Sequence, residues 1–550
     1  MSSYLVPSRA VPVSAGMIVA VPAELLASPL KSGRELGDRD RSALAVGGTE
    51  RIRAGGAVVF CKVIVVAEAQ VKRDGQVRAK GSPVRHATLG PLEEAGPGQV
   101  ALAAERAPLD ARFVKGERER LLARAFMVRA LVLMTLVPGA GLGDALAALA
   151  GDLALVPWAR PWRPASARAC GDWRNALGPG PLEELRDLVL GTAWAGHRDR
   201  GCPGAVTVGA KAPLRAGSLD GTLLRVPDTP ANRAFFGTVG TADGAGPYPC
   251  LRALPVTCCS CRALFALPSG PAGTDKAAAE QGLLDEAAGC FPGLSDPGWV
   301  WLMDRNYHGA ARIARIIRAT HVLIRLKSDV PLNRTSEILP DGSYEAELSG
   351  DGATVKVRVI EYYVDVEGQD VPEMFCLVTD LLDWEDYPGP ELAALYKWRW
   401  DGSETALREA KAPLRGAGPG TTPMLRSGAP ALVFQELAAW AAGTGMARGV
   451  VLDAALAAAP ARKGRRAGLT VRPRDLSFAR ALRAVVSAVR LGLDRYQAVT
   501  SEIAAHRTVV DRSRHRPRKS KSPSSFPHAG PADTVTRIAP AVITMANTPA

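Results

Sequence analysis

The sequence lacks any apolar run long enough to cross a bilayer. The best candidate, residues 125–137, is interrupted by Arg129 and is shorter than the roughly 20 apolar residues that a membrane helix needs. The first seven residues, MSSYLVP, also lack the basic region and the continuous apolar region of a signal peptide. We therefore expect a cytoplasmic protein without a membrane span.

Cysteine is scarce, with nine residues at irregular spacing. An odd, irregular set argues against a disulfide framework and is expected in a reducing compartment. Cys258 and Cys261 form a lone Cys-x-x-Cys pair inside an apolar, strand-like stretch. Because a second pair at zinc spacing is missing, we expect buried thiols here rather than a metal site.

Acidic residues are also in deficit, with 55 Asp and Glu against 68 Lys and Arg, which gives a net charge of +13. This balance favours a polyanionic partner, nucleic acid above all. Basic residues gather at 462–466 and 512–521. These stretches suit nonspecific contact with phosphate, although solvated tails have the same composition.

The 550 residues are enough for several domains, and periodicity divides the chain into four regions. The first, residues 1–115, is poorly specified apart from a possible buried strand at 58–67. The second is a small helical domain, the third alternates strands and helices, and the fourth is basic and ends in a disordered tail. Their bounds are 116–205, 206–450 and 451–550, with helices expected at 117–136, 144–153, 182–194 and 429–442 and near 478–493.

The third region has the element order of an α/β fold. Three antiparallel strands lead into parallel units, which is the order of an RNase H-like core with a mixed sheet. A β-strand insertion at about 330–385, with turn signals at 341–342 and 351–352, precedes the last helix. The expected elements are strands 218–226, 249–256 and 263–267, helix 274–288, strand 299–303, helix 309–319 and strand 321–327.

Residues 396–411 concentrate a phenol, a guanidinium, a carboxylate and an ammonium group. From about Gly402 onward we expect a helix, capped by Ser403. Seven residues are close to two helical turns, so Glu404 and Lys411 lie on nearly one face. Taken alone, this pattern is typical of a solvated amphipathic helix.

Three carboxylates change that interpretation. Asp220 lies on the first strand of the core, Asp304 directly follows an apolar strand, and Glu404 lies on the late helix. In such a core the first and fourth strands are neighbours, so the carboxylates can meet at one end of the sheet. Together they can hold two divalent cations, whereas without metal they would repel one another. Asp220 taken singly is typical of an ordinary turn.

Three segments resemble the acidic signatures of DDE transposases of the insertion sequence 4 family. They are residues 219–228 (LDGTLLRVPD), residues 302–307 (LMDRNY) and the set Tyr396-x-x-Arg399…Glu404…Lys411. The likeness covers about residues 117–450 and is most specific at the third signature.

The resemblance implies an RNase H-like catalytic core and two Mg²⁺ or Mn²⁺ ions held by Asp220, Asp304 and Glu404 as the catalytic triad. Its substrate would be double-stranded DNA, namely the terminal inverted repeats of a mobile element and the target. A bacterial protein of this kind acts at the nucleoid, and we expect a homodimer in the DNA complex.

By the same resemblance, Tyr396, Arg399 and Lys411 contact DNA phosphates near the cleaved end. The chain departs from the family at one point: four residues, rather than three, separate Arg399 from Glu404. We place the extra residue in a turn at 400–402, before the helix starts. Glu409 is the competing acid, but it breaks the spacing on both sides.

Other residues have two interpretations each. Arg305 and Lys327 lie at the same strand ends and can contact phosphate or serve as surface charge. Trp384, Trp398 and Trp400 can stack on an exposed base or pack within the protein.

We expect a DNA transposase that hydrolyses and rejoins phosphodiester bonds at element ends. Water attacks first, the freed 3′-hydroxyl then attacks target DNA, and no covalent protein–DNA intermediate is needed. One alternative is a metal-dependent nuclease that cuts without joining. Another is a catalytically inactive DNA-binding protein derived from a transposase.

Overall fold

The computed structural model describes most of the chain from residue 124 to residue 491 and several short segments outside it. The main ranges are 124–153, 166–241, 244–273, 276–365, 373–414, 422–458, 470–491 and 542–547. Shorter described pieces are 10–13, 17–20, 44–54, 57–67, 416, 500, 503–504, 518–519 and 535–536.

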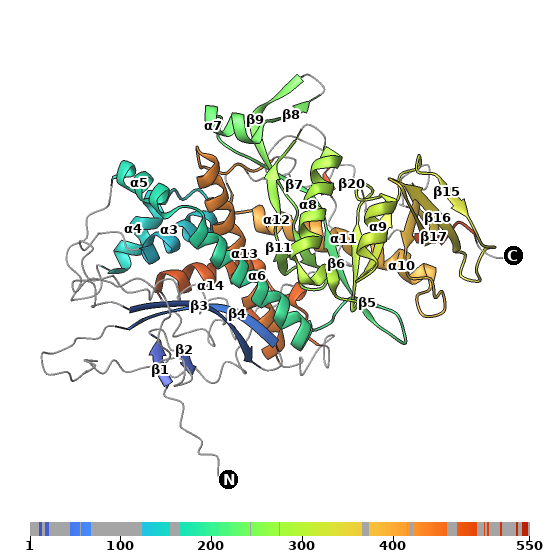
Figure 1. Ribbon diagram of the computed structural model, residues 1–550, viewed down its shortest axis with the longest axis horizontal. Helices are drawn as coiled ribbons and strands as arrows, with labels where there is room; N and C mark the ends of the chain where they lie inside the picture. Colours follow the sequence, from blue (N-terminus) through green and yellow to red (C-terminus); the bar gives the residue numbers. More distant parts are fainter. Residues whose placement is uncertain are drawn as a thin grey trace, which may run out of the picture.

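Helices from two distant parts of the sequence form one layer (Figure 1). Most of their buried apolar side chains belong to one cluster, centred on the long helix α13. Among the described helices, none combines the length and the apolar character needed to cross a membrane. The members are α3 (Arg124–Leu136), α4 (Leu142–Leu153), α5 (Ala167–Leu177), α6 (Gly180–Arg200), α13 (Pro430–Ala457) and α14 (Phe478–Leu491).

Most of these helices were expected from apolar periodicity, and α5 was not. Its sequence, ARACGDWRNAL, buries few side chains and therefore gives a weak helical pattern. Ser166 caps it, because its hydroxyl accepts a hydrogen bond from the backbone N–H of Ala169.

A large mixed sheet lies beside the helical layer (Figure 1). Its strand order is β11-β10-β6-β13-β14-β18-β17-β16-β15, with β5 beside β6 and β21 beside β17. β6, β13 and β14 run parallel, whereas β10 and β11 are antiparallel to their neighbours. These strands are β5 (Thr207–Val208), β6 (Leu214–Leu219), β10 (Val256–Cys258), β11 (Leu264–Ala266), β13 (Trp299–Met303) and β14 (His321–Arg325). The α/β class with a mixed sheet is confirmed.

The strand expected at 218–226 is wrong as a single element. The chain leaves the large sheet after Leu219 and starts a new strand, β7 (Thr222–Arg225), in a second sheet. Gly221 lies at this break, where a larger residue would not fit. A Cβ atom there would lie 2.3 Å from a carboxylate oxygen of Glu280. The strand expected at 249–256 divides in the same way. The second sheet contains β7, β8 (Thr238–Thr241), β9 (Gly244–Ala253) and β12 (Ser269–Pro271), with α7 (Pro230–Phe236) beside it.

The parallel units follow the predicted order. Two helices connect the strands, α8 (Lys276–Cys290) before β13 and α9 (Ala310–Ile316) before β14. β13 is buried along its whole length, WVWLM. Trp301 packs so closely against Gly217 on β6 that a Cβ atom at this glycine would lie 2.2 Å from the indole ring.

The strands expected at about 330–385 are present and form an antiparallel extension of the large sheet. Its strands are β15 (Leu332–Arg334), β16 (Tyr344–Gly350), β17 (Ala353–Asp365) and β18 (Glu373–Thr379). Asp351 and Gly352 join β16 to β17 with φ values of 51° and 72°, as a two-residue hairpin turn with left-handed backbone requires. Arg358 is buried beneath this sheet and pairs with Asp341. β21 (Val542–Met545) lies antiparallel to β17.

Near the N-terminus, the strand expected at 58–67 is confirmed as β4 (Ala57–Ala67), which pairs with β3 (Leu44–Ala54). β1 (Ala10–Val13) and β2 (Met17–Ala20) form another pair. The basic stretch 462–466 lies outside the described residues. So does most of 512–521, apart from β19 (Arg518–Lys519), which pairs with β20 (Val535–Thr536).

Candidate active site

Asp220 and Asp304 occupy matching places at one edge of the large sheet. β6 and β13 are parallel neighbours, and Leu219 lies opposite Met303 at the end of their pairing. Each aspartate is the next residue along its strand, and neighbouring strands lie about 4.8 Å apart. The carboxyl ends of two parallel strands therefore place both side chains at the same edge, as the sequence predicted.

The helix that carries Glu404 differs from the prediction. The chain is helical from Gly389 to Lys411, through α10 (Gly389–Tyr396), α11 (Trp398–Trp400), a π-helical turn at Asp401–Thr405 and α12 (Ala406–Lys411). No loop separates Arg399 from Glu404, and Ser403 lies inside the π turn rather than at a helix start.

A π turn accommodates one extra residue in an otherwise α-helical segment. The additional residue between Arg399 and Glu404 is therefore absorbed within the helix and not ahead of it. The predicted position, 400–402, overlaps the π turn, but the predicted loop and the Ser403 cap are wrong. Nothing in the residues 400–405 breaks a helix, so the chain has no reason to leave it.

Three side chains attach this helix to the ends of β6, β7 and β13. The Tyr396 hydroxyl donates to the carbonyl of Met303 at 3.0 Å, directly before Asp304. Arg399 forms an ion pair with Asp220 at 2.8 Å. Lys411 donates to the hydroxyl of Thr222, two residues beyond Asp220. The helix is thus fixed on both sides of Glu404.

The π turn is packed against the strand beside β6. The Thr257 hydroxyl donates to the carbonyl of Gly402 at 2.8 Å. A Cβ atom at Gly402 would lie 2.9 Å from the sulfur of Cys259 and 3.0 Å from the Cβ of Ser218. Arg262 pairs with Asp401 at 2.8 Å. Space at Gly402 is therefore needed to bring Glu404 to the strand ends.

We expect Gly402→Ala to lower the free energy of unfolding by about 1–2 kcal/mol. Overpacking in a buried contact costs roughly 1–3 kcal/mol, and better helix propensity returns up to about 1 kcal/mol. Gly282→Ala is the matched control, because Gly282 is an exposed helical glycine with nothing within 4 Å of an added Cβ atom. Urea unfolding should show the control stabilised and Gly402→Ala destabilised. Equal stabilisation of both variants would contradict close packing of the π turn.

The charges at the site act on one another. Burial raises the pKa of Asp220 to about 6, with a smaller contribution from the negative charges of Asp304 and Glu404 and against the lowering effect of Arg399. The oxygens of these three carboxylates do not all lie within 4.8 Å of one another. They nevertheless form one electrostatic group that disfavours additional negative charge and favours a cation.

We expect Asp220→Asn to stabilise the protein at pH 8. The folded pKa of about 6 lies above the usual aspartate value of 3.8, so ionisation of Asp220 costs native stability. The cost is absent below pH 4, grows as pH rises, and reaches roughly 3 kcal/mol above pH 6, at about 1.4 kcal/mol per pKa unit. Urea unfolding at pH 8 and pH 4 measures the difference. A variant that is less stable than wild type at pH 8 would show that the Arg399 ion pair outweighs burial.

Burial also lowers the pKa of Lys411, against the opposing effect of the Glu404 and Asp220 carboxylates. Burial raises the pKa of Tyr396 to about 12, so its phenol stays protonated and donates to Met303. That donor is used within the protein, and a phosphate contact by Tyr396 stays a prediction. Arg399 and Lys411 likewise have protein partners that a phosphate would have to share.

Glu409, the competing acid, forms ion pairs with residues outside the group of three carboxylates. Its carboxylate pairs with Arg262 at 2.9 Å and with Arg448 at 2.5 Å. Although burial opposes ionisation, these two arginines hold the pKa of Glu409 below its usual range. These two ion pairs indicate a structural role for Glu409. Glu404 is exposed and is the acid on this helix that acts on Asp220.

The supporting residues divide into exposed and packed ones. Arg305 is exposed directly after Asp304, and Lys327 is half-buried beyond the end of β14. Trp400 has 60% of its surface exposed, on the same helix as Glu404. Trp398, in contrast, stacks under Arg474 at 4.3 Å. Of the tryptophans on the site helix, Trp400 is the one open to a stacking partner.

Four side chains have roles at the site that were not anticipated. Thr222 accepts from Lys411, and Ser403 donates to the carbonyl of Arg399 at 2.8 Å and helps to lower the pKa of Asp220. Glu280, on α8, accepts from Asn306 at 3.1 Å behind Asp304. Tyr307 is fully buried, with Glu280 and the aspartates close enough to raise the pKa of its phenol. Of these four side chains, Glu280 alone had a signal in the sequence, as a glutamate within a predicted helix.

Comparison with known proteins adds a distant likeness in structure. No protein-family model and no curated protein matches the sequence. Among solved structures, the chain is similar to piggyBac transposase in its synaptic complex with hairpin DNA. The identity is 10%, the match covers 77% of this chain and 87% of that chain, and the TM-score is 0.36. A likeness at this level leaves function to be inferred from the chain's own residues.

Proposed function

We propose that this protein is a DDE transposase with an RNase H-like core, similar to the insertion sequence 4 family. The observation that carries the proposal is the convergence of three acids. Asp220 and Asp304 follow paired residues on adjacent parallel strands, and Glu404 lies on a helix anchored to both strand ends. The strand order β11-β10-β6-β13-β14, with β6, β13 and β14 parallel, supports the proposed core.

The donor set fits divalent cations that prefer oxygen. Asp220, Asp304 and Glu404 supply only carboxylate oxygens, as Mg²⁺ and Mn²⁺ prefer. Burial is the main cause of the raised pKa of Asp220, and the Asp304 and Glu404 carboxylates lie close enough to add to it. Two bound ions would assist the attacking and the leaving oxygen of an in-line displacement at phosphorus. The protein holds the carboxylates in place, through Arg399 for Asp220 and through Tyr396 for the strand end before Asp304.

The same surface suits a DNA end. Arg399 and Lys411 place positive charge beside the carboxylates, and Arg305 and Lys327 extend it along the sheet edge. Trp400 offers an exposed ring to an unpaired base. The proposed substrates are double-stranded terminal inverted repeats and target DNA, bound by a homodimer, with cleavage followed by strand transfer.

The test uses the purified full chain and DNA that flanks its coding frame. With Mg²⁺ or Mn²⁺, we expect nicks at the ends of an inverted repeat and joined products with a target plasmid, and neither with EDTA. Cleavage without joined products would identify a nuclease instead. Binding without cleavage would identify an inactive DNA-binding protein, and both outcomes would overturn the proposal.

A further inference from the structure

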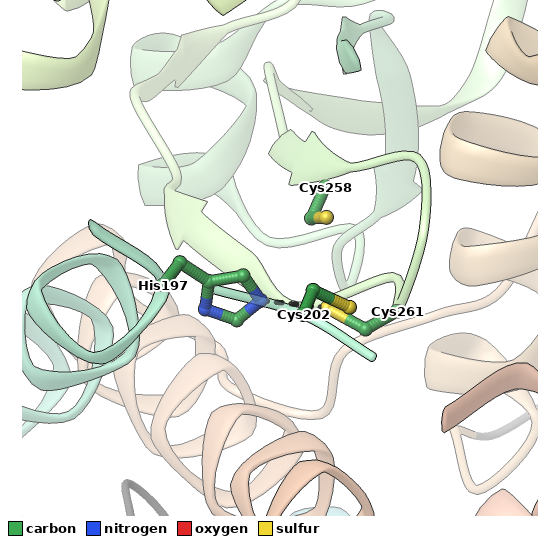
Figure 2. A group of neighbouring side chains, drawn as sticks. All are labelled: His197, Cys202, Cys258 and Cys261. Atoms are coloured by element: carbon green, nitrogen blue, oxygen red, sulfur yellow. Dashed lines mark hydrogen bonds between the residues drawn. The ribbon is translucent and has the colours of Figure 1, made fainter. Parts of the chain in front are cut away.

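Four soft ligands meet away from the carboxylates, behind the strand pair β10 and β11. His197 lies in the last turn of α6, Cys202 follows that helix, and Cys258 and Cys261 flank the turn after β10. One donor atom from each side chain lies within 4.8 Å of every other (Figure 2). Among the described residues, this is the group of His, Cys, Asp and Glu with that geometry.

The donor set and its spacing fit one zinc ion. Structural zinc sites are closed, tetrahedral and commonly made of three cysteines and one histidine. With bonds of about 2.3 Å to sulfur and 2.0 Å to nitrogen, donors around one zinc lie roughly 3.5–3.8 Å apart. The Nε2 atom of His197 is 2.8 Å from the sulfur of Cys261. A zinc ion bound to both atoms would replace this hydrogen bond, and the two atoms would have to move apart by less than about 1 Å.

The histidine is already oriented for such a role. Its Nδ1 atom lies 2.7 Å from the carbonyl of Ala193, so the proton resides on Nδ1 and the Nε2 lone pair faces the sulfurs. Donation of the second ring N–H to a carbonyl is the usual arrangement of a zinc-bound histidine. The ring also packs edge-on against Phe265, with centroids 4.9 Å apart, which fixes its plane.

The Cys-x-x-Cys turn is shaped around its first sulfur. The backbone N–H of Ser260 points to the sulfur of Cys258 at 3.4 Å, and the N–H of Arg262 donates to the Cys258 carbonyl at 2.8 Å. Arg262 adopts a left-handed backbone, with φ of 63°, to close this turn. Backbone donors aimed at a cysteine sulfur stabilise the thiolate form that binds metal.

Burial of four polar side chains costs free energy when no metal ion is bound, and a bound ion would offset this cost. His197, Cys258 and Cys261 are at most 3% exposed, and Cys202 is partly buried. A Cys₃His zinc centre carries one net negative charge, and Arg448 and Arg474 lie close enough to act on Cys261 and Cys202. A disulfide between Cys258 and Cys261 would account for two members of the group and leave the converging His197 and Cys202 without a function.

We propose that His197, Cys202, Cys258 and Cys261 bind one structural zinc ion. The ion joins the end of α6 to the turn between β10 and β11, two segments about 60 residues apart in the sequence. The same turn carries Cys259, which contacts Gly402, and Arg262, which pairs with Asp401. The zinc centre therefore supports the π turn that carries Glu404 without touching the reacting DNA.

The experiment uses the full chain, purified in reducing buffer without a metal-affinity tag. We expect about one equivalent of zinc by elemental analysis. After exchange with Co²⁺, a thiolate-to-cobalt charge-transfer band and intense d–d absorption should report tetrahedral coordination. Cys202→Ser and Cys261→Ser should each lower bound zinc to under about a tenth of an equivalent. Cys290→Ser and Cys376→Ser, at thiols outside the group, should retain it.

A second measurement uses the wild-type chain, so it tests the proposal even if the cysteine variants fail to fold. Mass spectrometry after alkylation should show Cys202, Cys258 and Cys261 protected until a strong chelator is added. No bound zinc, zinc retained by the Cys202→Ser/Cys261→Ser double variant, or a Cys258–Cys261 disulfide in the reduced preparation would each overturn the proposal. Zinc content does not depend on DNA cleavage, so the proposed transposase activity can fail without affecting this result.

Discussion

Asp304→Asn should reduce metal-dependent nicking by on the order of a thousandfold or more while DNA binding is retained. Asp304 follows the buried strand β13, whose last residue, Met303, lies opposite the residue that precedes Asp220. Asn keeps the size of the side chain, but it removes one anionic oxygen that the divalent ions need. DNA binding should persist, because the change removes a negative charge facing a polyanion. Gel-based nicking of labelled end DNA, with a mobility-shift assay in parallel, measures both effects.

Asp329→Asn is the matched control, because Asp329 is exposed just beyond Lys327 on the segment that leaves β14. The control should nick at the wild-type rate. Undiminished nicking by Asp304→Asn would remove Asp304 from the metal site and with it the proposed reaction.

A second pair of variants separates the two candidate acids on the late helix. Glu404→Gln should abolish nicking and leave thermal stability close to wild type, because Glu404 is exposed. Glu409→Gln should instead destabilise the fold, because Arg262 and Arg448 would lose the charge that they share. The reverse outcome would assign the catalytic role to Glu409.

Glu280→Ala should lower the free energy of unfolding by about 3–5 kcal/mol. Glu280 and Arg252 form an ion pair at 2.7 Å with both side chains 2% exposed. Removing one partner leaves the other charge buried and uncompensated, which is the costly outcome for such a pair. The carboxylate also holds Asn306 and lies against Gly221, so nicking should fall as well. Chemical denaturation, followed by nicking assays under native conditions, measures the two effects.

The double variant Arg252→Met/Glu280→Leu tests the cause. Removing both charges should recover much of the lost stability, because neither group is then left unpaired. A double variant as unstable as Glu280→Ala would show that volume, and not charge, governs this position. Nicking should stay low in both variants, since Asn306 loses its partner in each.

Much of the site follows from the sequence because it depends on strand ends. Asp304 directly follows five apolar residues, and a charge after a buried strand marks the edge of a sheet. The turns at Asp341-Gly342 and Asp351-Gly352 separate the strands of the insertion, and Gly342, Asp351 and Gly352 have positive φ there. Both signals are local, so a single sequence contains them.

Other features depend on contacts that are distant in the sequence. At the break after Leu219, the space beside Gly221 is occupied by Glu280, which comes about sixty residues later in the sequence. The π turn lies between Arg399 and Lys411, whose partners Asp220 and Thr222 are also distant in the sequence. His197 and Cys202 lie more than 50 residues before Cys258 in the sequence, so their relation to it became visible only in three dimensions.

The strand β21 determines when this protein can finish folding. It pairs with β17 along the edge of the insertion, and the backbone N–H of Ala546 donates to the carbonyl of Glu361. During synthesis this stretch of β17 stays open until residues 542–545 have left the ribosome, and an unpaired strand edge favours association between chains. A chain that stops before residue 542 would keep that edge exposed and would be prone to aggregation.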